Sequence, residues 1–395
     1  MKIIGLIAEY NPFHLGHLYQ INKIKEMYPE SIIIAIISTN FTQRGDISII
    51  NKWNKTKICL EHNVDIVLEL PTLYATQSSD VFAFAAIKIL NEFKIDTLVF
   101  GSESNNIDTL YELADTQLNN KQYDKLVKTY LTKGINYPTA MSKALKELTN
   151  IQIDKPNDLL GLSYIKEIIK NNYNITPISI QRTNNYHQEK LIINENNLNN
   201  KSSNNQLNIN NIISANLIRK LHQNNKDITS HIPKSTYQYL YQNLSINNAY
   251  NLLKYKIITN KNNLSNYLTV DEGIENRIIK YINNSNTWED LVMNIKTKRY
   301  TYNKINRMLI HILLDISKED NNKEIYLRIL GFNQQGRKYL NKIKKDIKLP
   351  IYTSYKDNLS TIFDIEFKSI YIYSLITNDK SLIKQEYQNK PIIKN

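Results

Sequence analysis

The first seventeen residues place the strongest constraint on the fold of this chain. A short apolar run, Lys2-Ile3-Ile4-Gly5-Leu6-Ile7-Ala8, is interrupted at Pro12, and a helical pattern follows from about residue 14 to 27. A buried strand that leads straight into an amphipathic helix is typical of α/β proteins. The helix opens with His14-Leu15-Gly16-His17, so it carries two imidazoles three residues apart, on one face.

This helix start is suited to binding an anion, because its first backbone N–H groups lack intrahelical partners and the helix dipole favours negative charge. Gly16 leaves room for a ligand against the backbone. Two of the chain's seven histidines stand on this one turn, which favours a site for ATP phosphates without a Walker loop. The alternatives are two ordinary polar histidines or a metal pair. The metal pair lacks a nearby third ligand, and we predict no metal-ligating residues.

Strand-like and helical patterns alternate over the first hundred residues. The strand-like runs are Ile3–Ile7, Ile32–Ile37, Val64–Leu68 and Thr97–Phe100, and helical patterns fall at about 14–27, 52–62 and 79–92. Apolar runs separated by amphipathic helices predict a parallel sheet. Right-handed crossovers put the carboxyl ends of such strands on one edge, where ligands bind. We therefore expect the His14–His17 turn, the loop 38–45 and the turn Phe100-Gly101-Ser102-Glu103 to meet.

The remaining pattern predicts two domains. Residues 107–148 and about 158–171 are helical in pattern, Thr176–Gln181 is strand-like, and the Asn-rich segment 183–211 reads as a polar loop. A helix that opens at Ser214 closes a domain of residues 1–225, and residues 226–395 read mainly as amphipathic helices. The only cysteine, Cys59, stands in an apolar helical context. With no signal-like segment and no apolar run of membrane length, we expect a cytoplasmic, soluble protein with no membrane contact.

Positive charge is concentrated in the second half of the chain. The chain has a net charge of +13, and the stretch 291–345 holds thirteen Lys and Arg against four Asp and Glu. Such a region suits a polyanion such as RNA. Lys296, Lys298, Arg299 and Tyr300 form a basic and aromatic cluster within it, for which a solvated helix face is the alternative.

The string from Gly5 to Tyr19 resembles the bacterial tRNA(Met) cytidine acetate ligases, a branch of the HxGH nucleotidyltransferase superfamily. Lys296-Thr297-Lys298-Arg299-Tyr300-Thr301 and Leu330-Gly331-Phe332 also match that family. The resemblance implies a Rossmann-like parallel-sheet nucleotidyltransferase domain that binds ATP, followed by a mainly α-helical, tRNA-binding C-terminal domain. The implied ATP-binding run comprises Ile7, Ala8, Glu9, Tyr10, Asn11, Pro12, Phe13, His14, Leu15, Gly16, His17, Leu18, Tyr19 and Gln20.

A second signature of the superfamily is matched by Ile213-Ser214-Ala215-Asn216-Leu217-Ile218-Arg219, in which Asn216 replaces the usual Thr. The resemblance implies that Ser214 and Arg219 act in catalysis beside His14 and His17. A Ser at a helix N-cap can donate to phosphate, and Arg can bind phosphate oxygens bidentately. Alternatively, Ser214 only caps its helix and Arg219 is solvated.

Other matching segments extend the implied site. Ser38 to Asp46 resembles a polar loop of the family with Thr39 in place of Gly, and Lys52-Trp53 and Glu69-Leu70-Pro71 match as either catalytic or fold-determining residues. Gly101, Asn157 and Arg182 are the further ATP-binding positions that the resemblance implies, although Asn157 could be a plain helix N-cap.

The implied activity joins acetate to N4 of the wobble cytidine of elongator tRNA(Met). ATP, with Mg²⁺ held through its phosphates, would first convert acetate to acetyl-adenylate. The partners expected are therefore this tRNA and acetate, with no stable protein partner inferred. Two other readings stay open: a small-molecule adenylyltransferase or synthetase of the same superfamily, and a non-catalytic RNA-binding protein that senses ATP.

Overall fold

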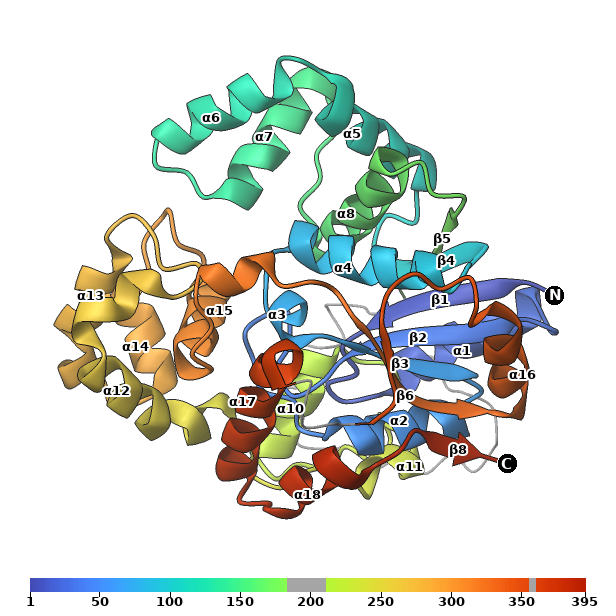
Figure 1. Cartoon of the computed structure of the whole chain (residues 1–395). Coiled ribbons are helices and arrows are strands. Elements are labelled where there is room, and N and C mark those ends of the chain that lie inside the picture. Colours follow the sequence, from blue (N-terminus) through green and yellow to red (C-terminus); the bar gives the residue numbers. More distant parts are fainter. Residues whose placement is uncertain (183–210, 355–359) are drawn as a thin grey trace.

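The computed structural model describes residues 1–182, 211–354 and 360–395, with side chains from residue 363 on in the last segment. The expected Asn-rich loop lies almost wholly outside these residues. An eight-stranded sheet with helices on both faces lies on the right in Figure 1, and helical parts extend from it to the top and to the left. Seven strands follow the order β5-β4-β1-β2-β3-β6-β7, and β8 pairs with β6. The strands are β1 (Ile3–Ala8), β2 (Ile32–Ser38), β3 (Ile66–Leu70), β4 (Thr97–Ser102), β5 (Thr176–Gln181), β6 (Leu327–Asn333), β7 (Ile351–Tyr352) and β8 (Ile392–Lys394).

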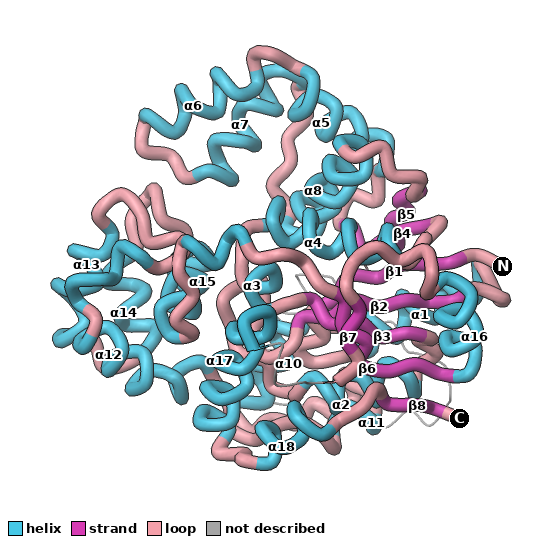
Figure 2. Tube along the Cα trace, viewed as in Figure 1, coloured by secondary structure: helices cyan, strands magenta, loops and turns pink. Residues whose placement is uncertain are grey.

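The parallel sheet expected from the first hundred residues is confirmed. β1 pairs in parallel with β2 and β4, β2 with β3, and β4 with β5. The carboxyl ends of these five strands therefore lie on one edge, which we call the catalytic edge. In Figure 2 the magenta strands form the middle layer and the cyan helices lie around them.

Each face of the sheet is covered by its own set of helices, because side chains alternate along a strand. On β2, Ile32, Ile34 and Ile36 belong to the core shared with α4 and α8, whereas Ile33 and Ile37 belong to the core shared with α1 and α2. The helices of this part are α1 (Leu15–Met27), α2 (Lys52–Glu61), α3 (Thr72–Ala75), α4 (Ser79–Glu92), α5 (Ile107–Asn119), α6 (Tyr123–Thr132), α7 (Tyr137–Thr149), α8 (Pro156–Lys170), α10 (Ala215–Gln223) and α11 (Lys234–Tyr237).

The second half is mainly helical, as expected. Its helices are α12 (Tyr250–Thr259), α13 (Ile274–Tyr281), α14 (Trp288–Ile295), α15 (Tyr302–Leu313), α16 (Gln334–Ile343), α17 (Ser360–Thr377) and α18 (Ser381–Gln388), with short 3₁₀ turns at Ile246–Ala249, Lys261–Asn266, Ile282–Asn284 and Glu319–Asn322. Among the helices that are described, none combines the length and the apolar character that crossing a membrane requires.

The chain then returns to the sheet. β6 pairs antiparallel with β3, with Ile66 opposite Phe332, and β8 pairs in parallel with β6. Strands from the second half of the chain therefore complete the sheet that begins at Ile3. The expected domain boundary near residue 225 thus does not separate a sheet-containing part from a purely helical part. The sequence pattern missed β6 because an antiparallel partner so distant along the chain leaves no local signal.

Candidate active site

His14 and His17 form a reciprocal cap at the start of α1. His14 is the N-cap residue with extended backbone angles, φ −137° and ψ 176°. Its Nδ1 accepts the N–H of Gly16 at 2.9 Å, while Nδ1 of His17 accepts the N–H of His14 at 3.2 Å. The ring centroids are 3.9 Å apart. Because both Nδ1 atoms accept hydrogen bonds, each neutral ring carries its proton on Nε2, so both histidines keep a side-chain N–H to donate to a ligand.

Gly16 is required for this packing. A Cβ at Gly16 would lie 2.7 Å from Cε1 and 3.0 Å from Nδ1 of His14. The imidazole of His14 can therefore lie against the helix backbone only if residue 16 has no side chain. Tyr10 supports the second ring, with its centroid 4.7 Å from that of His17 in an edge arrangement.

The imidazole of His14 is buried and that of His17 is half-buried, and both lie in a positively charged region. Burial, followed by the charges of Arg182, Arg219 and His231, lowers the pKa of His14 to about 3. Burial, followed by His14, Arg182 and Lys55, holds the pKa of His17 well below its ordinary value. Cations from several distant segments thus surround two neutral hydrogen-bond donors at a helix N-terminus. This arrangement favours a polyanionic ligand.

Arg219 and Ser214 come to the same edge. Ser214 caps α10, where its side chain accepts the N–H of Leu217 at 3.3 Å. Arg219 donates from Nη1 to the carbonyl of Asn11 at 2.7 Å, and its Nη2 lies 3.3 Å from a carboxylate oxygen of Asp46. Arg219 therefore links the turn after β1 to the loop after β2 and is not simply solvated.

Gly101, Asn157 and Arg182 come together at the ends of β4 and β5. The side chain of Arg182 lies over Gly101, with Cγ 3.4 Å from where a Cβ would stand. Arg182 also donates from Nη1 to Oδ1 of Asn157 at 3.3 Å. Asn157 is not the helix N-cap, since Lys155 takes that place. Its amide instead donates to Oε1 of Glu103 at 2.5 Å, which joins α8 to the turn after β4.

The loop after β2 connects this site to the helical part. Its Gln43 donates its backbone N–H to Oε1 of Glu9 at 2.7 Å, and its carbonyl accepts from Nη1 of Arg307 on α15 at 3.1 Å. A Cβ at Gly45, where φ is +73°, would collide with the backbone of Arg307. The side-chain oxygens of Ser38 and Thr39 are buried and have no hydrogen-bond partner among the described residues.

Two site residues escaped the sequence analysis. Lys55 on α2 is fully buried and donates from Nζ to the carbonyls of Glu9 at 2.8 Å, Ser38 at 3.0 Å and Thr39 at 3.0 Å. Burial lowers its pKa to about 7 despite the nearby charge of Glu9. Lys55 thus ties the ends of β1 and β2 together beneath the imidazoles. Its place three residues after Lys52, on the same helix face, was the available signal.

His231 is the second missed residue. Its carbonyl accepts the N–H of Leu15 at 3.1 Å, in the first turn of α1, and its Nδ1 lies 2.8 Å from the carbonyl of Asn211. The imidazole is 2% exposed, and its Nε2 has no partner in the described part of the chain. No local pattern identified it, because its contacts come from segments far apart in sequence.

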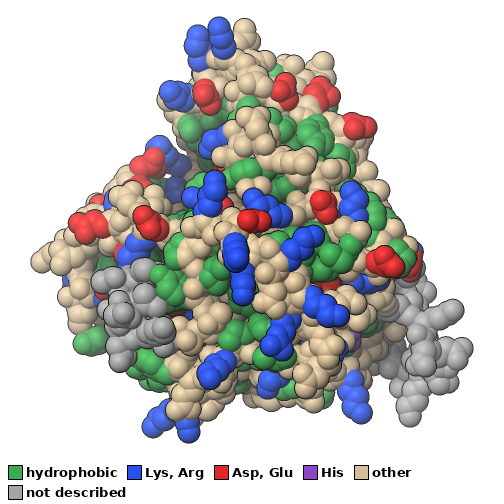
Figure 3. All heavy atoms as spheres, turned by 45° about the vertical axis from the view of Figure 1, so that its right-hand side comes forward, with side chains coloured by type: hydrophobic (Ala, Val, Ile, Leu, Met, Phe, Trp, Pro, Cys, Tyr) green, Lys and Arg blue, Asp and Glu red, His purple; other side chains and the backbone are tan. Residues whose placement is uncertain are grey.

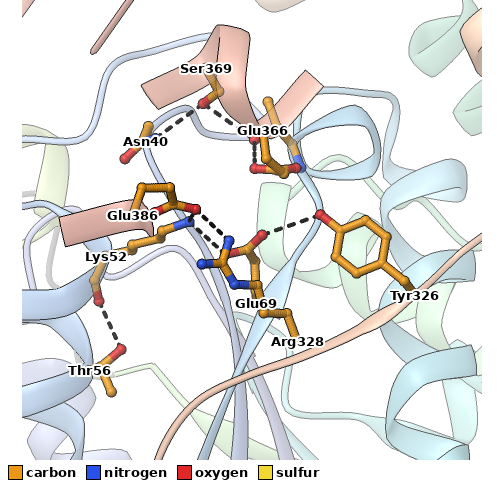
Figure 4. A network of polar contacts seen from close by, with 10 residues as sticks. Asn40, Lys52, Thr56, Glu69, Tyr326, Arg328, Glu366, Ser369 and Glu386 are labelled. Atoms are coloured by element: carbon orange, nitrogen blue, oxygen red, sulfur yellow. Dashed lines mark hydrogen bonds and ion pairs between the residues drawn. The ribbon is translucent and has the colours of Figure 1, made fainter. Parts of the chain in front are cut away.

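Lys52 and Glu69 belong to a buried ion network rather than to the phosphate site (Figure 4). Nζ of Lys52 contacts Oε2 of Glu69 at 2.8 Å and Oε1 of Glu386 at 2.7 Å, and Arg328 pairs with Glu386. Burial alone would raise the pKa of Glu386, but the charges of Arg328 and Lys52 hold it below its ordinary value. The network fastens α18 to α2, β3 and β6, which favours the fold-determining reading of Lys52 and Glu69.

The basic cluster of the helical part is only partly exposed. Lys296, Lys298 and Arg299 are exposed between α14 and α15, but Arg299 pairs with Glu272 at 2.6 Å. Tyr300 is 5% exposed, and its hydroxyl donates to the carbonyl of Asp271 at 2.7 Å. The tRNA contact of Tyr300 stays a prediction, but its buried ring offers no face on which a base could stack. The loop from α6 to α7 reaches the cluster through Nδ2 of Asn136, 3.3 Å from the carbonyl of Lys298.

The family is decided by a match over nearly the whole chain. The model of the HIGH Nucleotidyl Transferase family matches residues 1–389. The chain belongs to the HIGH nucleotidyl transferase family. Within this family it is 37% identical to the tRNA(Met) cytidine acetate ligase of Clostridium novyi over 99% of each chain, and 36% identical to that of Caldicellulosiruptor saccharolyticus over 99% of this chain and 98% of the relative.

Solved structures agree with this assignment. Crystal structures of Thermotoga maritima TmcAL, one in the apo form and one bound with alpha-thio ATP, each superpose with a TM-score of 0.86. They are 28% and 27% identical to this HIGH nucleotidyl transferase and cover 100% of its chain and 99% of their own. The α/β fold with a helical second half is therefore shared with these proteins.

Proposed function

We propose that this chain is a tRNA(Met) cytidine acetate ligase, an ATP-dependent enzyme that activates acetate and transfers the acetyl group to N4 of the wobble cytidine of elongator tRNA(Met). The reciprocal His14–His17 cap carries the proposal, since it presents two Nε2–H donors at a helix N-terminus surrounded by cations. Nearly full-length similarity to proteins named for this activity supports the choice of substrates. The tRNA substrate places the proposed reaction in the cytoplasm.

The triphosphate would lie at the start of α1. Its oxygens would accept hydrogen bonds from Nε2 of His14 and His17 and from N–H groups of the first turn. Arg219 would reach the phosphates by exchanging its contact with Asp46 for one with the ligand, because an Arg–phosphate pair is a strong charge-assisted interaction. Mg²⁺ would be held through the phosphates of ATP.

The nucleoside would lie over the ends of β4 and β5. Gly101 allows close approach to the backbone there, and Arg182 and Asn157 form a hydrogen-bonded pair beside it. Arg182 also contributes positive charge at both imidazoles. It would therefore connect the nucleoside part of the site to the phosphate part.

Acetate needs activation because a carboxylate is a poor electrophile with a poor leaving group. In the first step an acetate oxygen attacks the α-phosphorus, the bond to the β-phosphate bridging oxygen breaks, and pyrophosphate leaves. The imidazole donors and Arg219 would stabilise the negative charge that grows on the phosphate oxygens, so no covalent protein nucleophile is needed. In the second step the cytidine N4 amine attacks the acetyl carbonyl, loses a proton and releases AMP.

The helical part would dock the tRNA. Lys296 and Lys298 are exposed, and α15, which follows them, contacts the loop after β2 through Arg307. We propose residues 1–225 as the part that carries ATP chemistry and residues 226–395 as the part that carries RNA contacts, with β6 and β8 completing the sheet between them.

The deciding experiment supplies labelled acetate, ATP and tRNA, followed by identification of the labelled nucleoside. We expect label in N4-acetylcytidine and acetate-dependent ATP–pyrophosphate exchange without tRNA. Adenylation of another small molecule, with no labelled tRNA, would favour the small-molecule enzyme. ATP binding without pyrophosphate release would favour a non-catalytic RNA-binding protein that senses ATP.

A further inference from the structure

The positive charge of the stretch 291–345 is divided between two opposite ends of the molecule. The Lys296–Arg299 loop belongs to the helical part beyond the catalytic edge. Helix α16 instead lies at the amino end of the sheet. Asn333, which caps α16, donates from Nδ2 to Asp65 just before β3 at 2.7 Å, and the hydroxyl of Tyr339 donates to the carbonyl of Phe93 just before β4 at 2.8 Å. In Figure 1, α16 lies near the N-terminus, away from α15.

The α16 segment, residues 334–350, carries an unusual concentration of exposed cations. It holds one acid, Asp346, against six exposed basic side chains: Arg337, Lys338, Lys342, Lys344, Lys345 and Lys348. No ion pair in the described part of the chain involves any of these six. Figure 3, which turns this side forward, shows blue side chains spread across the middle of the face.

This arrangement works against stability in the isolated protein. Like charges one helical turn apart, such as Lys338 and Lys342, destabilise a helix by a few tenths of a kcal/mol. Some other cations of the described residues do have acidic partners: Lys256 pairs with Asp315 at 2.6 Å, and Lys318 pairs with Asp271 at 2.9 Å. A row of cations without acidic partners is the electrostatic footprint expected for a nucleic-acid backbone.

The distance between the two ends limits which part of the RNA reaches α16. Strands β1 and β2 have six and seven residues. At ~3.3 Å per residue the sheet is roughly 20 Å deep from one edge to the other. A phosphate held by α16 therefore lies roughly 20 Å or more from a base held beside His14 and His17, which is farther than the nucleotides next to that base reach.

We propose that the α16 segment is a second tRNA-binding surface, which contacts the phosphate backbone outside the anticodon stem-loop while the wobble cytidine lies at the catalytic edge. The proposal rests on the proposed function, because it takes the substrate to be a whole tRNA. Contacts of this kind fix the position of the RNA and do not read its bases. They also make the enzyme favour an intact tRNA over a fragment with the same anticodon.

The test compares full-length tRNA(Met) with its isolated anticodon stem-loop. Lys338 and Lys342 lie one turn apart on α16, and Lys345 lies in the turn that follows the helix. The three are replaced together by Gln, with the charge-preserving Lys→Arg triple as the matched control. We expect the Gln triple to weaken binding of full-length tRNA about tenfold or more and to lower its salt dependence by roughly 2 in slope, since each phosphate contact contributes about 0.7 to 0.9. Stem-loop binding and acetate-dependent ATP–pyrophosphate exchange should stay at parent values in both triples.

Unchanged binding of full-length tRNA by the Gln triple overturns the inference, as does an equal loss for tRNA and stem-loop. Loss in the Arg triple as well would show that packing rather than charge is affected. If the Gln triple loses ATP–pyrophosphate exchange through misfolding, Lys344→Gln with Lys345→Gln, beyond the helix end, replaces it. If the parent protein neither binds nor acetylates tRNA, the proposed function itself is wrong. If it acetylates tRNA and the Gln variants do so equally well, only the inference about α16 is wrong.

Discussion

Nδ1 of His17 accepts the backbone N–H of His14 at 3.2 Å, so the second imidazole of the pair holds the backbone of the first in place. Each ring is fixed through Nδ1 and keeps Nε2 for a ligand. Structural and catalytic roles therefore lie on different atoms of the same side chain, and amide side chains can separate them.

His17→Asn keeps an acceptor near the Nδ1 position and removes the Nε2 donor, whereas His17→Gln places an amide donor near Nε2. We expect His17→Asn and His17→Ala to lower acetate-dependent ATP–pyrophosphate exchange by about 10²- to 10³-fold, the loss typical for one transition-state donor. His17→Gln should recover part of the rate. Urea unfolding and tRNA binding should change little in His17→Asn. Normal exchange by His17→Ala would show that the residue is structural.

Gly16→Ala should displace the imidazole of His14, because the added Cβ would lie 2.7 Å from its Cε1. We expect at least a tenfold loss of exchange activity with a folded protein. Gly134→Ala is the matched control, since a Cβ there meets nothing within 4 Å although φ is +76°. It should cost about 1 kcal/mol of stability and no activity. Equal activity of the two variants would contradict the packing argument.

The pH dependence of stability should reveal the buried imidazole of His14. The pKa of His14 is about 3 in the folded protein, and its ordinary value is 6.5. As the pH falls below 6.5, His14 becomes protonated in the unfolded chain but stays neutral in the folded protein. The free energy of unfolding should therefore decrease between pH 6.5 and 3, by up to about 1.4 kcal/mol per pH unit for this group. Urea unfolding from pH 7.5 to 5 should give a shallower decrease for His14→Asn than for the parent, and identical slopes would contradict the assignment.

The opposite sign is expected at Glu366, whose pKa is raised to about 7 by burial and the charge of Glu69. Its ordinary value is 4.5, so its contribution to stability is present at low pH and is lost as pH rises towards 7. The difference in unfolding free energy between Glu366→Gln and the parent should therefore shift in favour of the variant when the pH is raised from 5 to 7. The two variants serve as controls for each other in the same titration.

Lys55→Met should both destabilise the protein and weaken ATP binding. It leaves three buried carbonyls without their donor, at about 1 kcal/mol each, and it removes a positive charge near His17. Lys52→Met, one turn earlier on α2, disturbs only the ion network with Glu69 and Glu386. We expect both variants to lose stability in urea, and only Lys55→Met to raise the KM for ATP. A raised KM in both would mean that the effect is not local.

Replacing Lys296, Lys298 and Arg299 by Ala should weaken tRNA binding while ATP–pyrophosphate exchange stays nearly intact. Most of the effect should come from Lys296 and Lys298, because Arg299 is paired with Glu272. Tyr300→Ala should instead lower the melting temperature, since its ring is buried. Parallel loss of exchange and tRNA binding in the triple variant would refute the separation of roles.

The first half of the fold could be predicted because its signals are local. The apolar run of β2 and the period of α4 identify those elements without reference to any partner, and the Pro12 break marks the end of the first strand. The same local logic predicted a phosphate site at His14 and His17, whereas Asn157 and Arg182 were proposed only from the family resemblance.

Long-range relationships could not be predicted. β6 pairs with a strand more than 250 residues earlier, the buried partners of Lys55 are backbone carbonyls from two other segments, and Glu272 neutralises Arg299 only after folding. The burial of Tyr300 has the same origin, since its hydroxyl partner, Asp271, comes from a distant loop. Counting charges along the sequence therefore overestimated the unpaired positive charge of the Lys296–Arg299 loop. It also treated that loop and α16 as one basic region.

The antiparallel pairing of β3 with β6 has a practical consequence for dissecting the protein. A fragment that stops near residue 225 would leave the apolar run of Ile66, Val67 and Leu68 as an open sheet edge, ready to pair with another molecule. Such a fragment should aggregate when it is produced alone. Shortening the protein to study ATP chemistry will therefore require that its last seventy residues be kept or supplied in trans.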